Sequence, residues 1–261
     1  MRRLILALII LGVTSALEAQ ETAQNADPAI AVADRVSVAE VLGLCVEAMG
    51  STDPLTAWVV EGQVLAYGQS QALPIVIESL GAQGYREEVS TPEGPAVAVV
   101  AGGKGESMRQ QKKRTEPLHA TQYHRAAHIP AAMCMPDPAM AYSLEKDAVV
   151  NGRAAYHVKL AAAAQGKDEQ EDRVDQILSE YHLYVDKQTG VALKSSFFAF
   201  SPDAIENRST VETYYSEYRN VNGVLMPFHL ETYLAGTKIR DLVFTSIRAD
   251  ITLTSRDFTL E

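Results

Sequence analysis

The spacing of hydrophobic positions changes once near the start of the chain. In "SVAEVLGLCVEAMG", residues 37–50, apolar side chains recur every three or four residues, which is typical of one face of a helix. Ser37 and Glu40 have the spacing of a capping box, and Gly50 is suited to end a helix. We therefore predict one amphipathic helix over this segment.

Apolar and polar residues then alternate with period two through most of the chain. Four such runs follow one another between residues 56 and 107 with no room for a helix between them, and strands joined this closely are antiparallel. Seven further runs cover about residues 143–150, 153–163, 180–186, 191–200, 210–221, 224–234 and 238–249. This pattern predicts a mainly β (α+β) protein with a strongly curved antiparallel sheet of about 10 to 11 strands.

Three segments depart from the alternation. The stretch 117–142 is rich in alanine and is cut by three prolines, which predicts two short helices or turns. The charged stretch 165–175 predicts a long exposed loop, and the basic run "RQQKKR" (109–114) is interpreted as the solvated end of a strand, with an anion contact as the alternative.

The last two hairpins allow a prediction of which side chains share a face. A two-residue turn at 222–223 pairs residues whose numbers sum to 445, and a turn at 236–237 pairs those that sum to 473. Pro227 cannot donate to a strand ladder, so we expect it where its strand has an unpaired side, a bulge or a bend. The aliphatic face predicted from these registers includes Val211, Tyr215, Met226, Phe228, Leu230, Val243 and Ile247.

An aliphatic face of this size needs a cover. The predicted helices are few and small, so we predict a partly unfilled apolar cavity on the concave side of the sheet. Met133, Met135 and Met140 are flexible apolar side chains that suit a lid over such a cavity. A closed barrel or a sandwich packed solid by its own side chains is the alternative.

The N-terminus has the plan of a secretory signal peptide. Arg2 and Arg3 precede about ten apolar residues and then a small-residue segment, so we predict a cleavable signal over 1–19, a flexible leader over 20–35 and a single domain over 36–261. An uncleaved membrane anchor is the alternative. The net charge of −10 repels phosphate backbones, so we expect no nucleic-acid partner. Cys45 and Cys134 can form a disulfide in an oxidising compartment.

Catalytic and metal-binding motifs give little support for an enzyme. There is no G-x-S-x-G, C-x-x-C or H-E-x-x-H pattern, and "AGGKGES" (101–107) is better interpreted as a hairpin turn than as a phosphate loop. His124 and His128 are one helical turn apart but have no acidic or cysteine ligand beside them. We therefore predict no catalytic residues, no metal and no cofactor.

The C-terminal half contains a series of turn motifs in "NGRAAYHV" (151–158), "YVDKQTG" (184–190), "YSEYRNVNGVLMP" (215–227) and "SRDF" (255–258). The first three have the form G-x-x-x-Y-x-V, Y-x-D-x-x-T-G and Y-x-x-Y-R-x-V-x-G-V-x-x-P, and the last is a terminal D-x-x-F-like strand that departs slightly here. In these motifs the chain resembles the LolA/LolB-like superfamily of periplasmic lipoprotein carriers and lipoprotein-sorting proteins. The match is good from about residue 145 to the end and holds only in general plan before it.

The resemblance implies an incomplete barrel whose concave apolar face, covered by helices, holds acyl chains. It implies a non-enzymatic protein that shelters acyl chains of lipoproteins or lipids. We predict a periplasmic monomer, with transient membrane-protein donors or acceptors as partners. It also brings Cys45 on the first helix close to Cys134 on the lid, where a bridge would limit lid opening. The alternatives are a periplasmic sensor or interaction module that regulates a membrane partner, and a secreted enzyme with an unrecognised site.

Overall fold

The computed structural model describes seven stretches of the chain: residues 36–51, 57–81, 83–116, 130–166, 168–201, 204–249 and 251–260. The predicted signal peptide and leader, and the pair His124 and His128, lie outside these residues. Residues Val36–Glu261 belong to one compact unit. No helix within the described stretches has the length and apolar character needed to cross a membrane.

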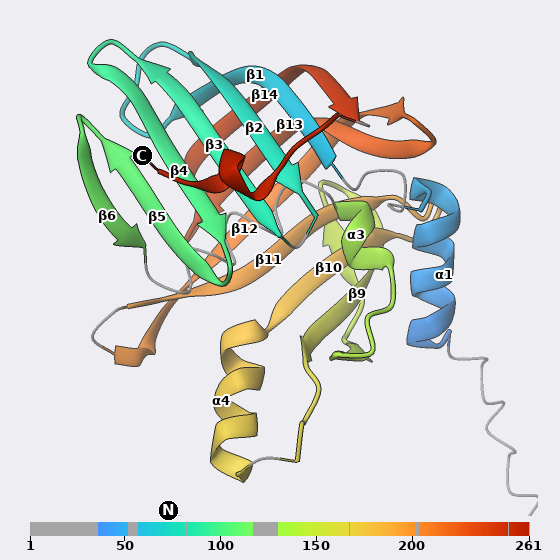
Figure 1. The fold of residues 1–261 in the computed structure, drawn as a ribbon. Coiled ribbons are helices and arrows are strands. Elements are labelled where there is room, and N and C mark those ends of the chain that lie inside the picture. Colours follow the sequence, from blue (N-terminus) through green and yellow to red (C-terminus); the bar gives the residue numbers. More distant parts are fainter. Residues whose placement is uncertain are drawn as a thin grey trace, which may run out of the picture. The chain divides into compact units, whose positions relative to one another are not determined.

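The described strands form one antiparallel sheet (Figure 1). They are β1 (Ala57–Ala66), β2 (Leu73–Leu80), β3 (Gly84–Thr91), β4 (Gly94–Ala101), β5 (Lys104–Arg109), β6 (Lys112–Glu116), β7 (Met140–Leu144), β8 (Ala148–Val150), β9 (Arg153–Ala162), β10 (Tyr181–Asp186), β11 (Ala192–Ser201), β12 (Ala204–Val221), β13 (Val224–Leu234) and β14 (Thr237–Ala249).

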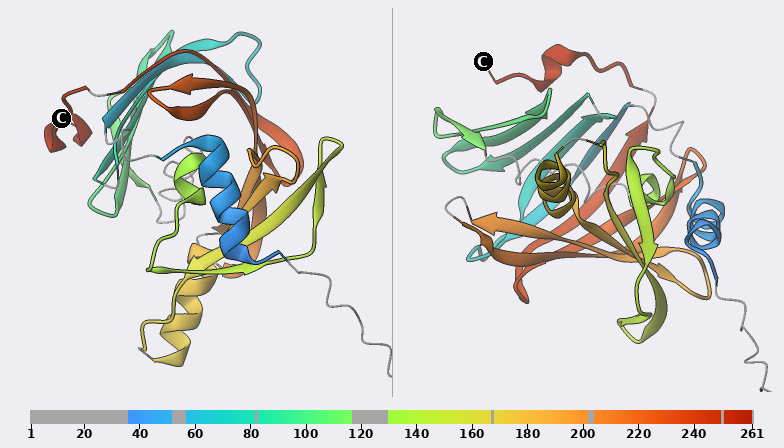
Figure 2. Two further views of the ribbon diagram at one scale, coloured as in Figure 1. Left: turned by 90° about the vertical axis from the view of Figure 1, so that its right-hand side faces the viewer. Right: turned by 90° about the horizontal axis from the view of Figure 1, so that it is seen from below.

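The sheet is a curved, open barrel-like layer whose two edges, within the described residues, are β6 and β7 (Figure 2). Its order is β6-β5-β4-β3-β2-β1-β14-β13-β12-β11-β10-β9-β7, and β8 also pairs with β9. Neighbours in the sheet are neighbours in sequence almost throughout, so hairpin turns alone specify most of it. The pairing of β1 with β14 is the long-range exception, and it joins the first and last of the described strands in the middle of the sheet.

Fourteen strands in the described sheet exceed the predicted number for two reasons. The basic run 109–114 is a hairpin, not a strand end: Gln110 and Gln111 form the turn between β5 and β6 with φ of +50° and +61°. Glutamine is uncommon at such angles, so the sequence carried no usual turn signal. The predicted strand 143–150 is also divided into β7 and β8, both of which pair with β9.

The predicted loop over 165–175 is wrong, because most of it belongs to helix α4 (Glu169–Ser179). Asp168 caps this helix by accepting a hydrogen bond from the backbone N–H of Gln170. Three acidic residues lie in its first turn, where their negative charges are stabilised by the positive end of the helix dipole. The helix buries none of its residues, so its polar composition was mistaken for that of a loop. Figure 1 shows α4 projecting away from the sheet.

The C-terminal segment covers the outer face of β3 and β4. Ser255–Phe258 is a 3₁₀ helix, so the expected terminal strand is wrong. Phe258 packs with Val97, Val99 and Leu260 in a small core of its own. Gly84 makes this packing feasible, because a Cβ there would overlap the Phe258 ring.

Helix α1 (Val38–Met49) has the predicted capping box: the Ser37 hydroxyl accepts from the Glu40 backbone N–H, and the Glu40 carboxylate accepts from that of Ser37. Two glycines let α1 lie against the ends of hairpins. A Cβ at Gly190 would lie 2.7 Å from the Leu44 carbonyl oxygen, and one at Gly50 would overlap the Gly223 carbonyl oxygen. The position of α1 therefore depends on the turns after β10 and β12.

The turn after β10 is held by the carboxylate of Asp186, which is 3% exposed. It accepts hydrogen bonds from the backbone N–H groups of Gln188 (2.9 Å) and Thr189 (2.7 Å), and it pairs with the Arg153 guanidinium at 2.7 Å. Burial alone would raise the pKa of Asp186, but these hydrogen bonds and the guanidinium together hold that pKa below its usual value.

Replacing Asp186 with asparagine is expected to lower the free energy of unfolding at neutral pH by about 1 to 3 kcal/mol, because charge-assisted hydrogen bonds and an ion pair are lost. Since the folded-state pKa lies below the unfolded one, this stabilisation is complete above about pH 4 and is lost as the pH falls through the folded value. Urea unfolding at pH 7 and at about pH 2 measures both effects. Asp147→Asn is the control: Asp147 is exposed and pairs with Lys187, so its loss should change little.

Candidate functional site

The inner, concave face of the sheet is apolar along β12 and β13. The predicted register is confirmed, because pairs such as Val211 with Leu234 and Tyr215 with Leu230 sum to 445. Five of the residues predicted to line a cavity lie on this face, are almost fully buried and belong to the main core: Val211, Tyr215, Met226, Phe228 and Leu230. A cavity beside them stays a prediction.

The register predicted for β14 is wrong. The turn is made by Ala235 and Gly236, both with positive φ, and a bulge at Thr232 and Tyr233 then shifts the pairing so that Leu230 lies opposite Leu242. A one-residue slip sends side chains to the opposite face. Leu242 is therefore 1% exposed on the inner face, whereas Val243, which was assigned to that face, is 43% exposed on the outer one.

Ile247 nevertheless lies on the inner face, as predicted, because a second irregularity compensates for the first. The pairing of β1 with β14 shifts between Glu61 and Gly62, which leaves Thr245 without a partner in the ladder. Ile247 then pairs with Val60 and packs against the main core.

Pro227 lies where the sequence placed it, on a part of its strand with one unpaired side. Within the described residues β14 pairs with β13 only from His229 to Leu234, whereas Pro227 pairs with Tyr218 on β12 alone. The proline therefore costs the sheet no hydrogen bond to β14.

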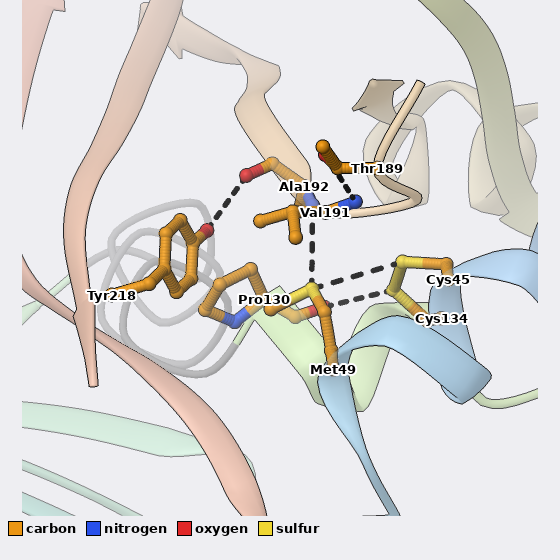
Figure 3. Close-up of a disulfide and its surroundings, with 8 residues drawn as sticks. All are labelled: Cys45, Met49, Pro130, Cys134, Thr189, Val191, Ala192 and Tyr218. Atoms are coloured by element: carbon orange, nitrogen blue, oxygen red, sulfur yellow. Dashed lines mark hydrogen bonds between the residues drawn. A yellow bond between two sulfur atoms is a disulfide. The ribbon is translucent and has the colours of Figure 1, made fainter. Parts of the chain in front are cut away.

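Two helices cover the inner face on the side of β7 to β13 (Figure 2). α1 contacts β7 and β13, and the short helix α3 (Pro130–Cys134) contacts β11 and β13. A disulfide between Cys45 and Cys134 joins the two helices, as Figure 3 shows, and both cysteines are fully buried. The Ala192 backbone N–H donates to the sulfur of Met49 at 3.3 Å, which ties α1 to β11.

The three methionines predicted as a lid are divided between two elements. Met133 lies on α3 and packs against the main core, and Met135 follows that helix. Met140 also packs against the core, but it begins β7, so it belongs to the sheet edge and not to the helical cover. Only the first two remain candidates for a lid.

The covered half of the inner face contains a short chain of buried hydroxyl groups. The Tyr181 hydroxyl donates to Ser195, and the Ser195 hydroxyl is bonded in turn to that of Tyr215. Burial raises the pKa of Tyr181 to about 12 and also raises the pKa of Tyr215. These groups are therefore uncharged at neutral pH and satisfy one another, which suits an apolar environment.

The other half of the inner face, on β1 to β5, has fewer contacts with α1 and α3 and carries small side chains on β4. Ala96 and Ala98 on β4 are only partly buried, and they lie opposite Val89 and Glu87 of β3. Glu87 accepts hydrogen bonds from the Tyr85 hydroxyl at 2.9 Å and from the Arg240 guanidinium at 2.7 Å. Glu87 and Arg240 are the one charged pair that we find on this part of the described face, and each compensates the charge of the other.

A pocket of about 220 Å³ opens beside these residues, at the ends of β2, β3 and β4. It is lined by Ser79, Gly81, Gly84, Tyr85, Val100, Ala101, Gly102 and Gly103. Ser79 lies directly opposite Trp58 on β1 and opposite Tyr85 on β3, so pocket and inner face are continuous along one row of the sheet.

A group with metal-ligand chemistry occurs in the described residues, at His229, Glu231 and Asp241. His229 lies between the inward side chains Phe228 and Leu230, so this group is on the outer face. The Lys238 ammonium donates to both carboxylates, and His229 Nε2 lies 2.9 Å from Asp241. A lysine already neutralises the carboxylates that a metal would need, so the donor set does not fit a metal site.

Comparison with known proteins rests on structure alone. No protein-family model matches the chain. No curated protein matches it either. A LolA superfamily protein from Nitrosomonas europaea superposes with a TM-score of 0.54 at 13% identity, over 87% of this chain and 99% of that one. The chain has the LolA-like fold. At this level of identity the likeness concerns the fold alone.

Two further solved structures are similar to this chain in fold. One is described as an outer membrane lipoprotein-sorting protein domain from Vibrio parahaemolyticus, with a TM-score of 0.50 and 8% identity over 84% of this chain and 95% of that one. The other is a DUF1329 family protein from Desulfovibrio piger, with a TM-score of 0.53 and 11% identity over 86% and 98%.

Sequence reasoning missed the polar residues of the inner face. Trp58, Ser79 and the group formed by Tyr85, Glu87 and Arg240 were not among the predicted site residues. The period-two alternation of "TAWVVEGQVLAY" and "GYREEVS" does place Trp58 with Val60, and Tyr85 with Glu87, on common faces. The sequence pattern was therefore sufficient to predict which side chains of β1 and of β3 share a face. The pairing of β1 with β14, which brings Arg240 to Glu87, had no local sequence signal.

Proposed function

We propose that this protein binds acyl chains of lipids or lipoproteins on the concave face of its LolA-like fold and carries them without catalysis. The observation that carries the proposal is the large apolar inner face, half of it covered by two helices that a disulfide joins. Hydrocarbon binds such a surface through burial of apolar area, which needs no directional partner.

The distribution of polar groups supports the same function. The inner hydroxyls of Tyr181, Ser195 and Tyr215 are bonded to one another, and Glu87 is paired with Arg240. None of these groups therefore needs a polar ligand as a hydrogen-bond or ion-pair partner. The small side chains of β4 leave the least bulk over the half of the face that lies away from α1 and α3, and we propose that an acyl chain lies there.

We propose further that the protein is a monomer exported to the periplasm, where it meets donor and acceptor proteins of the membrane. The signal-peptide pattern of residues 1–19 supports export, and the buried disulfide suits an oxidising compartment. The likeness to a domain described as lipoprotein-sorting supports acylated cargo over other apolar ligands.

Ala98→Phe is expected to weaken binding of a fluorescent long-chain fatty acid about tenfold, because the new ring occupies space over the inner face. Val243→Phe adds similar bulk on the outer face of the same sheet and should leave binding unchanged. Fluorescence titration of the purified proteins measures both, after thermal unfolding shows that each variant is folded.

Native mass spectrometry of protein purified from the periplasm provides a second test. Co-purified acylated species are expected. A protein that remains empty and does not bind the fluorescent fatty acid would contradict carriage and favour the alternative, a module of the same fold that regulates a membrane partner.

A further inference from the structure

Trp58 has a buried polar atom that lacks a partner. Its side chain is 2% exposed, lies on β1 and belongs to the main core, yet its indole Nε1–H forms no hydrogen bond within the described structure. More than nine in ten buried polar groups in proteins are paired, because an unpaired one forfeits its hydrogen bonds to water. A donor left in this state at the wall of a binding surface indicates an acceptor that arrives with a ligand.

The position of Trp58 places this donor beside a second one. Ser79 lies directly opposite Trp58 in the antiparallel pair β1–β2, where side chains on one face are about 5 Å apart. Ser79 is 6% exposed, lines the pocket of about 220 Å³, and its hydroxyl makes no side-chain hydrogen bond with the described residues. The next residue of this row, Tyr85, donates its hydroxyl proton to Glu87.

We infer that the Trp58 N–H and the Ser79 hydroxyl bind the carbonyl oxygen of an ester or amide linkage in an acylated ligand. The inference rests on the proposed function, which supplies the acyl chain along the inner face. It adds that the linkage between chain and head group is recognised, so that the protein distinguishes an acyl lipid from a hydrocarbon or an ether of equal length.

The charges near this row favour a neutral linkage over a free carboxylate. Glu87 is the next acidic group on the inner face, one row from Ser79, and the Arg240 guanidinium beside it is engaged with Glu87 at 2.7 Å. Because that guanidinium is engaged, a carboxylate would find no unpaired cation in this row of the described residues, whereas an ester or amide carbonyl needs only the two donors.

A matched pair of ligands tests the inference on the full chain. Palmitoyl lysophosphatidylcholine and its hexadecyl ether analogue have the same chain length and head group, and differ in the ester carbonyl. We expect the ester to bind roughly three- to tenfold more tightly, which is the effect of one or two neutral hydrogen bonds. Titration below the micelle concentration measures both affinities.

The indole itself gives a direct signal, because Trp58 is the only tryptophan in the sequence. In a ¹⁵N-labelled sample its single indole N–H resonance should move downfield with the ester and much less with the ether. Trp58→Phe keeps an aromatic ring and removes one donor, so it should lose most of the preference for the ester, with ether affinity near that of the unmodified protein. Ser79→Ala should reduce the preference partly.

The outcomes separate the two proposals. If neither lysolipid binds, the proposed function fails and the inference fails with it. If both bind with equal affinity and the indole resonance does not distinguish them, acyl binding stands and the role of Trp58 is overturned. Should Trp58→Phe fail to fold, the ester and ether titrations of the unmodified protein decide alone.

Discussion

Replacement of both Cys45 and Cys134 with alanine is expected to lower the free energy of unfolding by about 4 to 5 kcal/mol. The bridge spans 89 residues of sequence, and a loop of that length loses much entropy when the unfolded chain is cross-linked. For a domain of this size the change corresponds to a melting temperature lower by roughly 10 to 18 °C. Thermal unfolding of the double variant and of the unmodified protein measures it.

A reductant provides the control for this prediction. It should lower the melting temperature of the unmodified protein toward that of the double variant and leave the variant itself unchanged. Equal melting temperatures for all four samples would show that the bridge contributes nothing. Because the disulfide joins α1 to α3, we also expect its loss to loosen the cover of the inner face, which faster hydrogen exchange of α1 would reveal.

Leu242→Gln should lower the free energy of unfolding by about 3 to 5 kcal/mol, whereas Val243→Gln should change it by less than about 1 kcal/mol. Leu242 is 1% exposed on the inner face, so glutamine there loses apolar burial and leaves an amide without partners. Val243 is 43% exposed on the outer face, where an amide meets water. Urea unfolding of the two variants gives the comparison.

This pair tests the register of β14 as well as the packing. The two residues are adjacent in sequence, so the glutamine variants differ mainly in the face that they alter. A larger effect of Val243→Gln than of Leu242→Gln would instead support the register in which paired residues of β13 and β14 have numbers that sum to 473, with Val243 on the inner face. Near-equal effects would mean that neither face of β14 is buried enough to matter.

The bulged hairpin β13–β14 shows where sequence patterns stop being sufficient. Turn signals and alternation place residues correctly while the ladder is regular, as the pairing between β12 and β13 demonstrates. A bulge adds one residue to one strand and reverses the assignment beyond it. No glycine or proline lies in β14 at either bulge, and the second is marked only by Gly62 on the partner strand β1. Val243 was misplaced for this reason, and Ile247 was placed well because two shifts cancelled.

The sequence by itself determined the features that depend on neighbouring residues. These are the capped helix α1, the meander of antiparallel strands, the turn at Asn222 and Gly223, and the inner-face positions along β12 and β13. Each follows from local geometry: capping, period-two alternation and turn conformation act over a few residues. The turn motifs of the sequence are therefore sufficient to predict the LolA-like fold.

Only the tertiary structure decided what depends on pairs far apart in the chain. The pairing of β1 with β14 brings Arg240 to Glu87, and the packing of two helices brings Cys45 to Cys134. The partnerless indole of Trp58 belongs to the same class, because a missing hydrogen bond is defined by everything around it. Such features arise when strands and helices that are far apart in the sequence pack around one core, and local sequence patterns do not predict that packing.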